Sequence, residues 1–163
     1  MKNTLDNNYK EVKNFSNPLC DVPLSRHFRL AEFTRSATAI RCGIDNNPHA
    51  TIIMALQALC INVLEPLRER FGVLRITSGY RCKLLNEEIG GSRTSQHMLG
   101  EAADIHVGSR EVAMKMFNFV VNNLPFDQML VEMKRGKVHC LHISYRQQGP
   151  NRRKVSSYYN MKK

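Results

Sequence analysis

The sequence contains no tryptophan and few cysteines, and the positions of those cysteines argue against two kinds of site. The cysteines are an odd number, are widely spaced and form no Cys-x-x-Cys pair; they are Cys20, Cys42, Cys60, Cys82 and Cys140. A small disulfide scaffold uses an even number of cysteines, and a structural zinc site with cysteine ligands uses closely spaced pairs. Neither is indicated, so we expect reduced thiols.

Long apolar runs are also missing. Residues 1–9 lack the apolar stretch of a signal peptide, and no later run approaches the ~18 apolar residues that a membrane span needs. The sequence therefore predicts no membrane span. We expect a protein that is cytoplasmic as synthesised, or that is released to the cell wall if it derives from a phage.

Acidic residues are absent from the C-terminal end. Residues 146–163 hold six of the 24 lysines and arginines and no acid. Residues 25–145 hold fifteen basic and eleven acidic residues, which leaves them only +4 of the formal net charge of +10. Such a mildly basic core is weak support for a nucleic-acid groove, so nucleic acid is disfavoured as a partner. The basic end has the charge to touch any polyanion, but we expect a solvated, frayed tail.

The domain organisation follows from length and composition. A chain of 163 residues with 42% hydrophobic residues and no low-complexity tract fits one domain with a buried core. The first residues are polar and include Pro18 and Pro23, which favour an arm over a core element. We therefore expect a polar arm over 1–23, one folded domain over 24–146 and a basic tail over 147–163.

Hydrophobic periodicity predicts both helices and strands. Helical spacing or caps mark four segments, residues 24–33, 48–71, 82–89 and 110–123. Within the longest, Pro66 should kink or split the helix near Asn62, and Ser109 should cap the last. β-type runs mark four strands, residues 73–78, 101–107, 128–133 and 138–145, with a hairpin turn at 134–137. The predicted fold class is α+β, a small antiparallel sheet with helices packed on one face.

Three side chains form a candidate metal-binding set. His97 lies in a loop between two glycine-bearing stretches, and Asp104 and His142 lie within predicted strands. Strand alternation places Asp104 on the less apolar face of residues 101–107, so the three side chains can meet over one sheet. Two imidazoles and one carboxylate suit a catalytic zinc whose fourth position stays open for water. The alternative for each histidine alone is a hydrogen-bonded core or surface residue.

An ordered series of short motifs surrounds this set: SRHFRLAEF at 25–33, GIDN at 43–46, VLEPLR at 63–68, SGYR at 78–81, the run from GGS to Asp104 at 90–104, FDQ at 126–128 and HISY at 142–145. The series resembles the M15 zinc peptidases, specifically the D-Ala-D-Ala carboxypeptidase-like domains of bacterial and phage cell-wall enzymes, over about residues 24–146. The resemblance implies the hedgehog/DD-peptidase fold. It also implies one zinc ion per chain, bound by His97, Asp104 and His142.

The same resemblance implies roles for nearby polar residues. Arg81 matches the arginine that meets the substrate carboxylate or the developing oxyanion, and Ser95 matches a serine on the substrate side. The alternatives are a surface arginine that closes a turn and a serine that caps a loop. The catalytic base stays open between Glu132 and His139, which lies three residues before His142 and needs a bulge to face the site. We favour Glu132.

The chain departs from the family pattern at Cys140. Relatives usually carry tryptophan two residues before the last histidine. Cys140 shares a predicted strand face with His142, so its thiol is close enough to perturb or join the metal site. The alternative is a small buried apolar residue. The replacement bears on catalytic activity rather than on the fold.

We therefore expect a zinc metallopeptidase that hydrolyses peptidoglycan stem peptides or their precursors, as a D,D-carboxypeptidase or an endopeptidase. Two alternatives remain. One is a catalytically weak or inactive zinc-binding module of the same fold that binds cell-wall peptides, and the other is a basic adaptor whose tail binds an anionic polymer. The retained ligand set, with Arg81 and Glu132, favours the peptidase, and the mildly basic core weighs against the adaptor.

Overall fold

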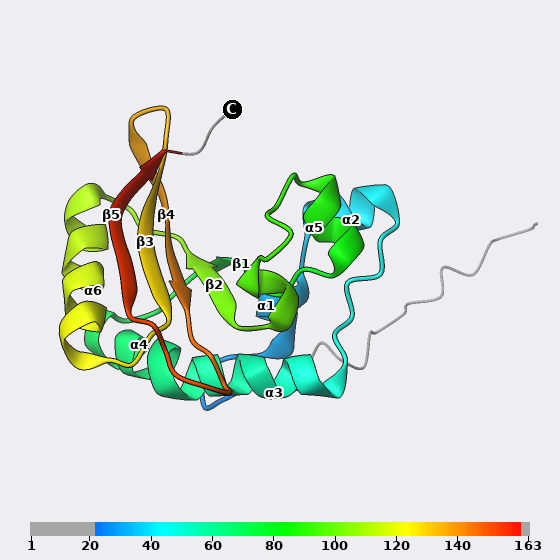
Figure 1. The fold of residues 1–163 in the computed structure, drawn as a ribbon, viewed down its shortest axis with the longest axis horizontal. Helices are drawn as coiled ribbons and strands as arrows, with labels where there is room; N and C mark the ends of the chain where they lie inside the picture. The colour runs from blue at the N-terminus through cyan, green and yellow to red at the C-terminus, as the bar shows by residue number, and fades with distance from the viewer. Residues whose placement is uncertain (1–21, 161–163) are drawn as a thin grey trace, which may run out of the picture.

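The computed structural model describes residues 22–160, so nearly all of the arm predicted over 1–23 lies outside the described residues. The helices are α1 (Leu30–Thr34), α2 (Ala37–Cys42), α3 (Ala50–Leu59), the π-helical η2 (Cys60–Leu64), α4 (Glu65–Phe71), α5 (Lys83–Glu88), the 3₁₀ turn η3 (Gln96–Leu99) and α6 (Arg110–Asn123). The strands are β1 (Ile76–Ser78), β2 (Ala102–Ile105), β3 (Gln128–Lys134), β4 (Lys137–Ser144) and β5 (Lys154–Asn160). In Figure 1, α6 lies on one side of the sheet, α5 on the other, and α3 with α4 below.

The predicted helix over 48–71 is present, and its break falls where Pro66 requires one. Pro66 has no N–H for the carbonyl of Asn62, and η2 replaces one α-helical turn with wider π-type hydrogen bonds just before it. Contrary to our expectation from the sequence, Ala50–Phe71 is long and apolar enough to pass as a membrane span by composition. Leu56, Leu64 and Leu67, however, are fully buried in the core, as in the central helix of a folded domain.

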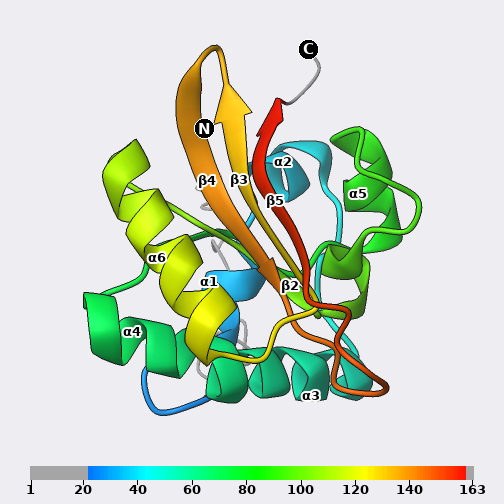
Figure 2. The ribbon, with the colours of Figure 1, turned by 60° about the vertical axis from the view of Figure 1, so that its left-hand side comes forward.

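The five strands form one sheet in the order β1-β2-β4-β3-β5, which confirms the α+β class. β1 with β2, β2 with β4 and β4 with β3 are antiparallel pairs, whereas β5 runs parallel to β3. The sheet is therefore mixed rather than purely antiparallel, as Figure 2 shows for β5 beside β3. The prediction of a frayed tail was wrong for residues 154–160, because they form this edge strand.

A buried carboxylate holds the start of β5 in place. Asp127 is fully buried and accepts hydrogen bonds from Nε of Arg152 at 3.0 and 3.1 Å and from the backbone N–H of Arg152 at 3.0 Å. The carbonyl of Asp127 accepts the N–H of Lys154 at 2.9 Å. The guanidinium of Arg153 donates to the Leu124 carbonyl at 3.0 Å, just beyond α6. The basic residues predicted to be solvated are thus bound to the domain.

We expect Asp127→Asn to lower the free energy of unfolding by about 1.5–3 kcal/mol, the range for hydrogen bonds to charged groups. The loss should stay below the 3–5 kcal/mol of a fully buried pair, because Arg152 is 48% exposed and water can solvate it again. Urea denaturation at pH 7 measures the change. Glu111→Gln, which removes the exposed ion pair with Lys115, is the control and should have little effect.

The ion pair between Asp127 and Arg152 should contribute stability that is lost in acid. Burial alone raises the pKa of Asp127, but the hydrogen bonds from Arg152 outweigh burial and hold this pKa below its usual range. A depressed folded pKa adds stability above the unfolded pKa, about 3.9, which is lost as the pH falls through the folded value. Denaturation curves in acid should therefore converge for wild type and Asp127→Asn, and a constant difference down to pH 2 would contradict this origin.

The two faces of the sheet differ in chemistry. One face is apolar and packs against the helices; its buried residues are Ala103, Ile105, Met129, Val131, Leu141 and Ile143. The residues between them on β2, β3 and β4 point to the opposite face and include polar side chains. This confirms the alternation predicted for residues 101–107. On α6, Met116, Phe117 and Val120 are buried against this core, whereas Val112 is 41% exposed.

Candidate metal centre

His97 is fixed in the site by one hydrogen bond from the far side of its ring. It lies on η3, only 2% exposed, and its Nδ1 lies 2.6 Å from the carbonyl oxygen of Gly79, just after β1. Gly79 is required there, because a Cβ atom would lie 2.6 Å from Cα of Phe33 in α1. Since a carbonyl only accepts, Nδ1 carries the proton and Nε2 faces the site with its lone pair.

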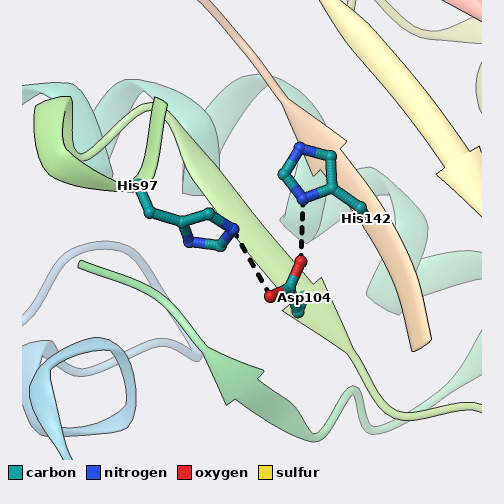
Figure 3. A group of neighbouring side chains, drawn as sticks. All are labelled: His97, Asp104 and His142. Atoms are coloured by element: carbon teal, nitrogen blue, oxygen red, sulfur yellow. Dashed lines mark hydrogen bonds and ion pairs between the residues drawn. The ribbon is translucent and has the colours of Figure 1, made fainter. Parts of the chain in front are cut away.

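Asp104 and His142 are directly opposite each other on neighbouring strands. They are register partners on β2 and β4, and Nδ1 of His142 lies 2.8 Å from Oδ1 of Asp104. Nε2 of His97 lies 3.3 Å from the other oxygen, Oδ2. The carboxylate therefore stands between the two imidazoles, whose centroids are 5.1 Å apart (Figure 3). One donor atom from each residue lies within 4.8 Å of the others, so the structure brings the predicted ligand set together.

The protonation states fit a bound cation. Burial lowers the pKa of His97, which favours the neutral ring with its single proton on Nδ1. Its buried Nε2 accordingly has no hydrogen-bond partner, although it faces a carboxylate oxygen. Two lone pairs that face each other at this distance repel unless a cation lies between them. A metal ion would supply that cation, with the carbonyl of Gly79 orienting the ligand as outer partners of metal-bound histidines do.

Asp104 is in the state that a metal ligand needs. Burial alone raises its pKa, but the adjacent imidazoles of His97 and His142, the second through its hydrogen bond to Oδ1, outweigh burial and hold this pKa well below its usual range. Asp104 is therefore a carboxylate. An anionic oxygen beside imidazole nitrogens is the donor chemistry of zinc and related divalent metals.

Glu132 and Cys140 form a second pair beside the metal-binding set. They are register partners across β3 and β4, and Sγ of Cys140 donates to Oε2 of Glu132 at 3.4 Å. Each of the two residues has an atom able to bind a metal that lies within 4.8 Å of such an atom of Asp104. Burial raises the pKa of Cys140 far above its usual value, so the thiol stays protonated and holds the Glu132 carboxylate. Cys140 is thus both a buried residue and a neighbour of the site.

His139 does not join this group. Glu132 pairs with Cys140 and Met133 with Val138, so His139 is the extra residue of a β-bulge in β4. The bulge that we considered necessary is present, but it leaves His139 exposed in a separate depression beside the hairpin turn. Its proposed part in the site is not supported by its position, and Glu132 is the candidate base that lies near the metal-binding residues.

A cleft of about 600 Å³ opens over the metal-binding residues. Its lining combines η3, the preceding loop and three strands: Arg81, Ser92, Thr94, Ser95, Gln96, His97, Gln128, Leu130, Glu132, His142, Arg152 and Lys154. Arg81 is half-buried, its buried Nε has no hydrogen-bond partner, and its guanidinium is close enough to Asp104 and Glu132 to interact with their negative charges. Ser95 makes no capping hydrogen bond to η3. Both residues face the cleft rather than serving only a turn or a cap.

A family model described as Peptidase M15 matches residues 26–141, well over half of the chain. This chain belongs to the Peptidase M15 family. The resemblance found in the sequence is thereby confirmed, and with it the expectation of a metallopeptidase type of enzyme. A comparison with curated proteins gives no match. The family match ends one residue before His142. The evidence that places His142 beside His97 and Asp104 is therefore the structure and not the family match.

The C-terminal segment contributes to the cleft of this M15 domain, which we did not expect from the sequence. Arg152 and Lys154 line it, although both lie beyond the family match. Residues 154–160, KVSSYYN, include valine and two tyrosines, which are residue types favoured in strands, and could have signalled β5. The excess of basic residues in this segment instead suggested a solvated tail. The acid that binds Arg152 is Asp127, which lies far away in the sequence, so nothing near Arg152 indicated that the segment is anchored.

Proposed function

We propose that this M15 domain is a zinc-dependent peptidase that hydrolyses peptidoglycan peptides containing D-amino acids, as a D,D-carboxypeptidase or an endopeptidase. The observation that carries the proposal is the unpartnered Nε2 of His97, which faces the Asp104 carboxylate beneath an open cleft. A purely structural histidine at 2% exposure would have both ring nitrogens satisfied. The D-amino-acid substrate is supported by the motif resemblance to cell-wall enzymes.

The residues of the cleft have separate roles in the proposed peptide hydrolysis. Zinc held by His97, Asp104 and His142 would polarise the scissile carbonyl and make water more acidic. Glu132 faces the cleft beside this set and is placed to accept a proton from the attacking water and to return it to the leaving amine. The thiol of Cys140 keeps its carboxylate oriented. Arg81 supplies a fixed cation for the substrate carboxylate or for the developing negative charge.

The experiment that tests this function combines two measurements on the purified protein. Elemental analysis should find about one zinc per chain. Mass spectrometry of purified peptidoglycan fragments after incubation should show released D-alanine or cleaved stem peptides, and the product masses identify the bond. Zinc-loaded protein that binds the fragments but leaves their masses unchanged would instead favour the inactive module of the same fold.

Arg81 should be needed as an arginine and not only as a positive charge. We expect Arg81→Lys to be nearly as damaging as Arg81→Ala, because an ammonium cannot reproduce the two parallel hydrogen bonds of a guanidinium. Steady-state kcat/KM should fall by an amount equivalent to about 1.5–3 kcal/mol, the range for charge-assisted hydrogen bonds. Arg93→Lys, an exposed substitution on a nearby loop, is the matched control. Wild-type rates in both Arg81 variants would reduce this residue to a structural role.

A further inference from the structure

We propose that β5 adds a second anion-binding position to the cleft, formed by Lys154 with Arg152, which selects peptides with a carboxylate on the amino side of the scissile bond. This inference rests on the proposed peptidase function and extends it to a substrate class. It concerns residues beyond the end of the family match at residue 141.

The register of the sheet places Lys154 on the same face as the metal-binding residues. Lys154 is the partner of Gln128, and Leu130, two residues further on the same face of β3, is the partner of His142. Because β3 separates β4 from β5, the backbone of Lys154 lies two strand spacings across and two residues along from that of His142, roughly 12 Å in all. Both side chains line the same cleft.

The charges of the cleft leave a cation available at this position. Its lining holds Arg81, Arg152 and Lys154 against a single acid, Glu132, which lies near Arg81. Arg152 is held by Asp127 and remains 48% exposed. Lys154 is exposed, and its ammonium forms no ion pair with any residue in the described range 22–160. An anionic group that enters here meets one free and one partly neutralised cation.

The position is fixed by the fold rather than by a flexible tail. The backbone N–H of Lys154 donates to the carbonyl of Asp127, and the Asp127 side chain holds the neighbouring Arg152 through both its backbone and its guanidinium. Arg153 is anchored to the chain that follows α6. The attachment point of the Lys154 side chain is therefore preorganised, which lowers the entropic cost of binding an anion.

The order of the strands gives the substrate a direction. Arg81 follows β1, Lys154 begins β5, and these strands are the opposite edges of the sheet, with Asp104 and His142 on β2 and β4 between them (Figure 1). A peptide whose carboxyl-terminal part meets Arg81 therefore extends its amino-terminal part toward β5. At about 3.3 Å per extended residue, a span of roughly 12 Å corresponds to about three to four residues. The preferred carboxylate lies about that far before the scissile bond.

Two synthetic peptides that end in D-Ala-D-Ala test this selection. One carries glutamate and the other glutamine three residues before the scissile bond. Wild-type protein should favour the glutamate peptide by about three- to tenfold in kcat/KM, through KM, with kcat unchanged. Lys154→Gln should remove the preference, Lys154→Glu should invert it, and added salt should weaken it because the site is exposed. Lys137→Gln, at an exposed lysine in the hairpin, is the matched control.

The outcomes separate this inference from the proposed function. An unchanged ratio between the two peptides in Lys154→Glu, with hydrolysis intact, would overturn the anion-binding position while leaving the peptidase in place. If wild type hydrolyses neither peptide, calorimetric binding of the same pair decides: tighter binding of the glutamate peptide that Lys154→Glu abolishes would support the position without turnover. Equal binding of the two peptides, or no binding of either, would overturn it.

Discussion

Replacing Asp104 with alanine should leave the purified protein with almost no bound zinc and no measurable peptide hydrolysis. Asp104 supplies the only negative charge of the proposed ligand set and stands between the two imidazoles. Its loss removes both a ligand and the charge that offsets a divalent cation. His97→Ala should have the same effect, because it removes a nitrogen that nothing else in the site replaces. Elemental analysis of the purified variants, with circular dichroism to check folding, measures the outcome.

Matched controls separate loss of a ligand from loss of a charge or a ring. Glu69→Ala removes an exposed acid from α4, and His49→Ala removes an exposed histidine before α3; both should retain the wild-type zinc content. Zinc that is undiminished in both Asp104→Ala and His97→Ala would show that the metal binds elsewhere. Zinc that is retained only in His97→Ala would show that His97 is not a metal ligand. The unpartnered Nε2 of His97 would then have no explanation.

The sequence predicted the site better than it predicted the edges of the sheet. The motif around His97 and Asp104, together with strand alternation, was enough to place both residues near His142, because alternation decides which face a side chain occupies. The two-residue turn at Arg135 and Gly136, both with positive φ, also followed from local sequence. These features depend on short stretches of chain, which a single sequence records directly.

Features that depend on distant partners were not predictable in the same way. The ion pair between Asp127 and Arg152 joins residues 25 positions apart, and nothing near Arg152 in the sequence indicates its partner. The parallel pairing of β5 with β3 follows from that anchor. The bulge at His139 depends likewise on how β4 adjusts to β3, so its exposure could not be inferred from its spacing to His142. The rim of the cleft was therefore missed although its centre was found.

Glu132→Gln should keep both the zinc content and the fold but lower peptide hydrolysis by roughly 10²-fold or more, as expected for the loss of a positioned proton acceptor. The amide has the size of the carboxylate, and its oxygen can still accept the thiol of Cys140, so the packing between β3 and β4 should persist. Without a basic oxygen, the variant has no group in this position to take up a proton. Steady-state hydrolysis of D-Ala-terminated peptides, compared at equal zinc content, measures the loss.

The companion variant His139→Ala decides between the two candidate bases. His139 is exposed on the bulge and lies in a different depression from the cleft, so its removal should change hydrolysis far less than Glu132→Gln does. The reverse result, with His139→Ala inactive and Glu132→Gln active, would require β4 to rearrange so that the imidazole turns into the cleft. That rearrangement would also break the Cys140–Glu132 contact. The two substitutions therefore test the register of the β3–β4 hairpin together with the identity of the base.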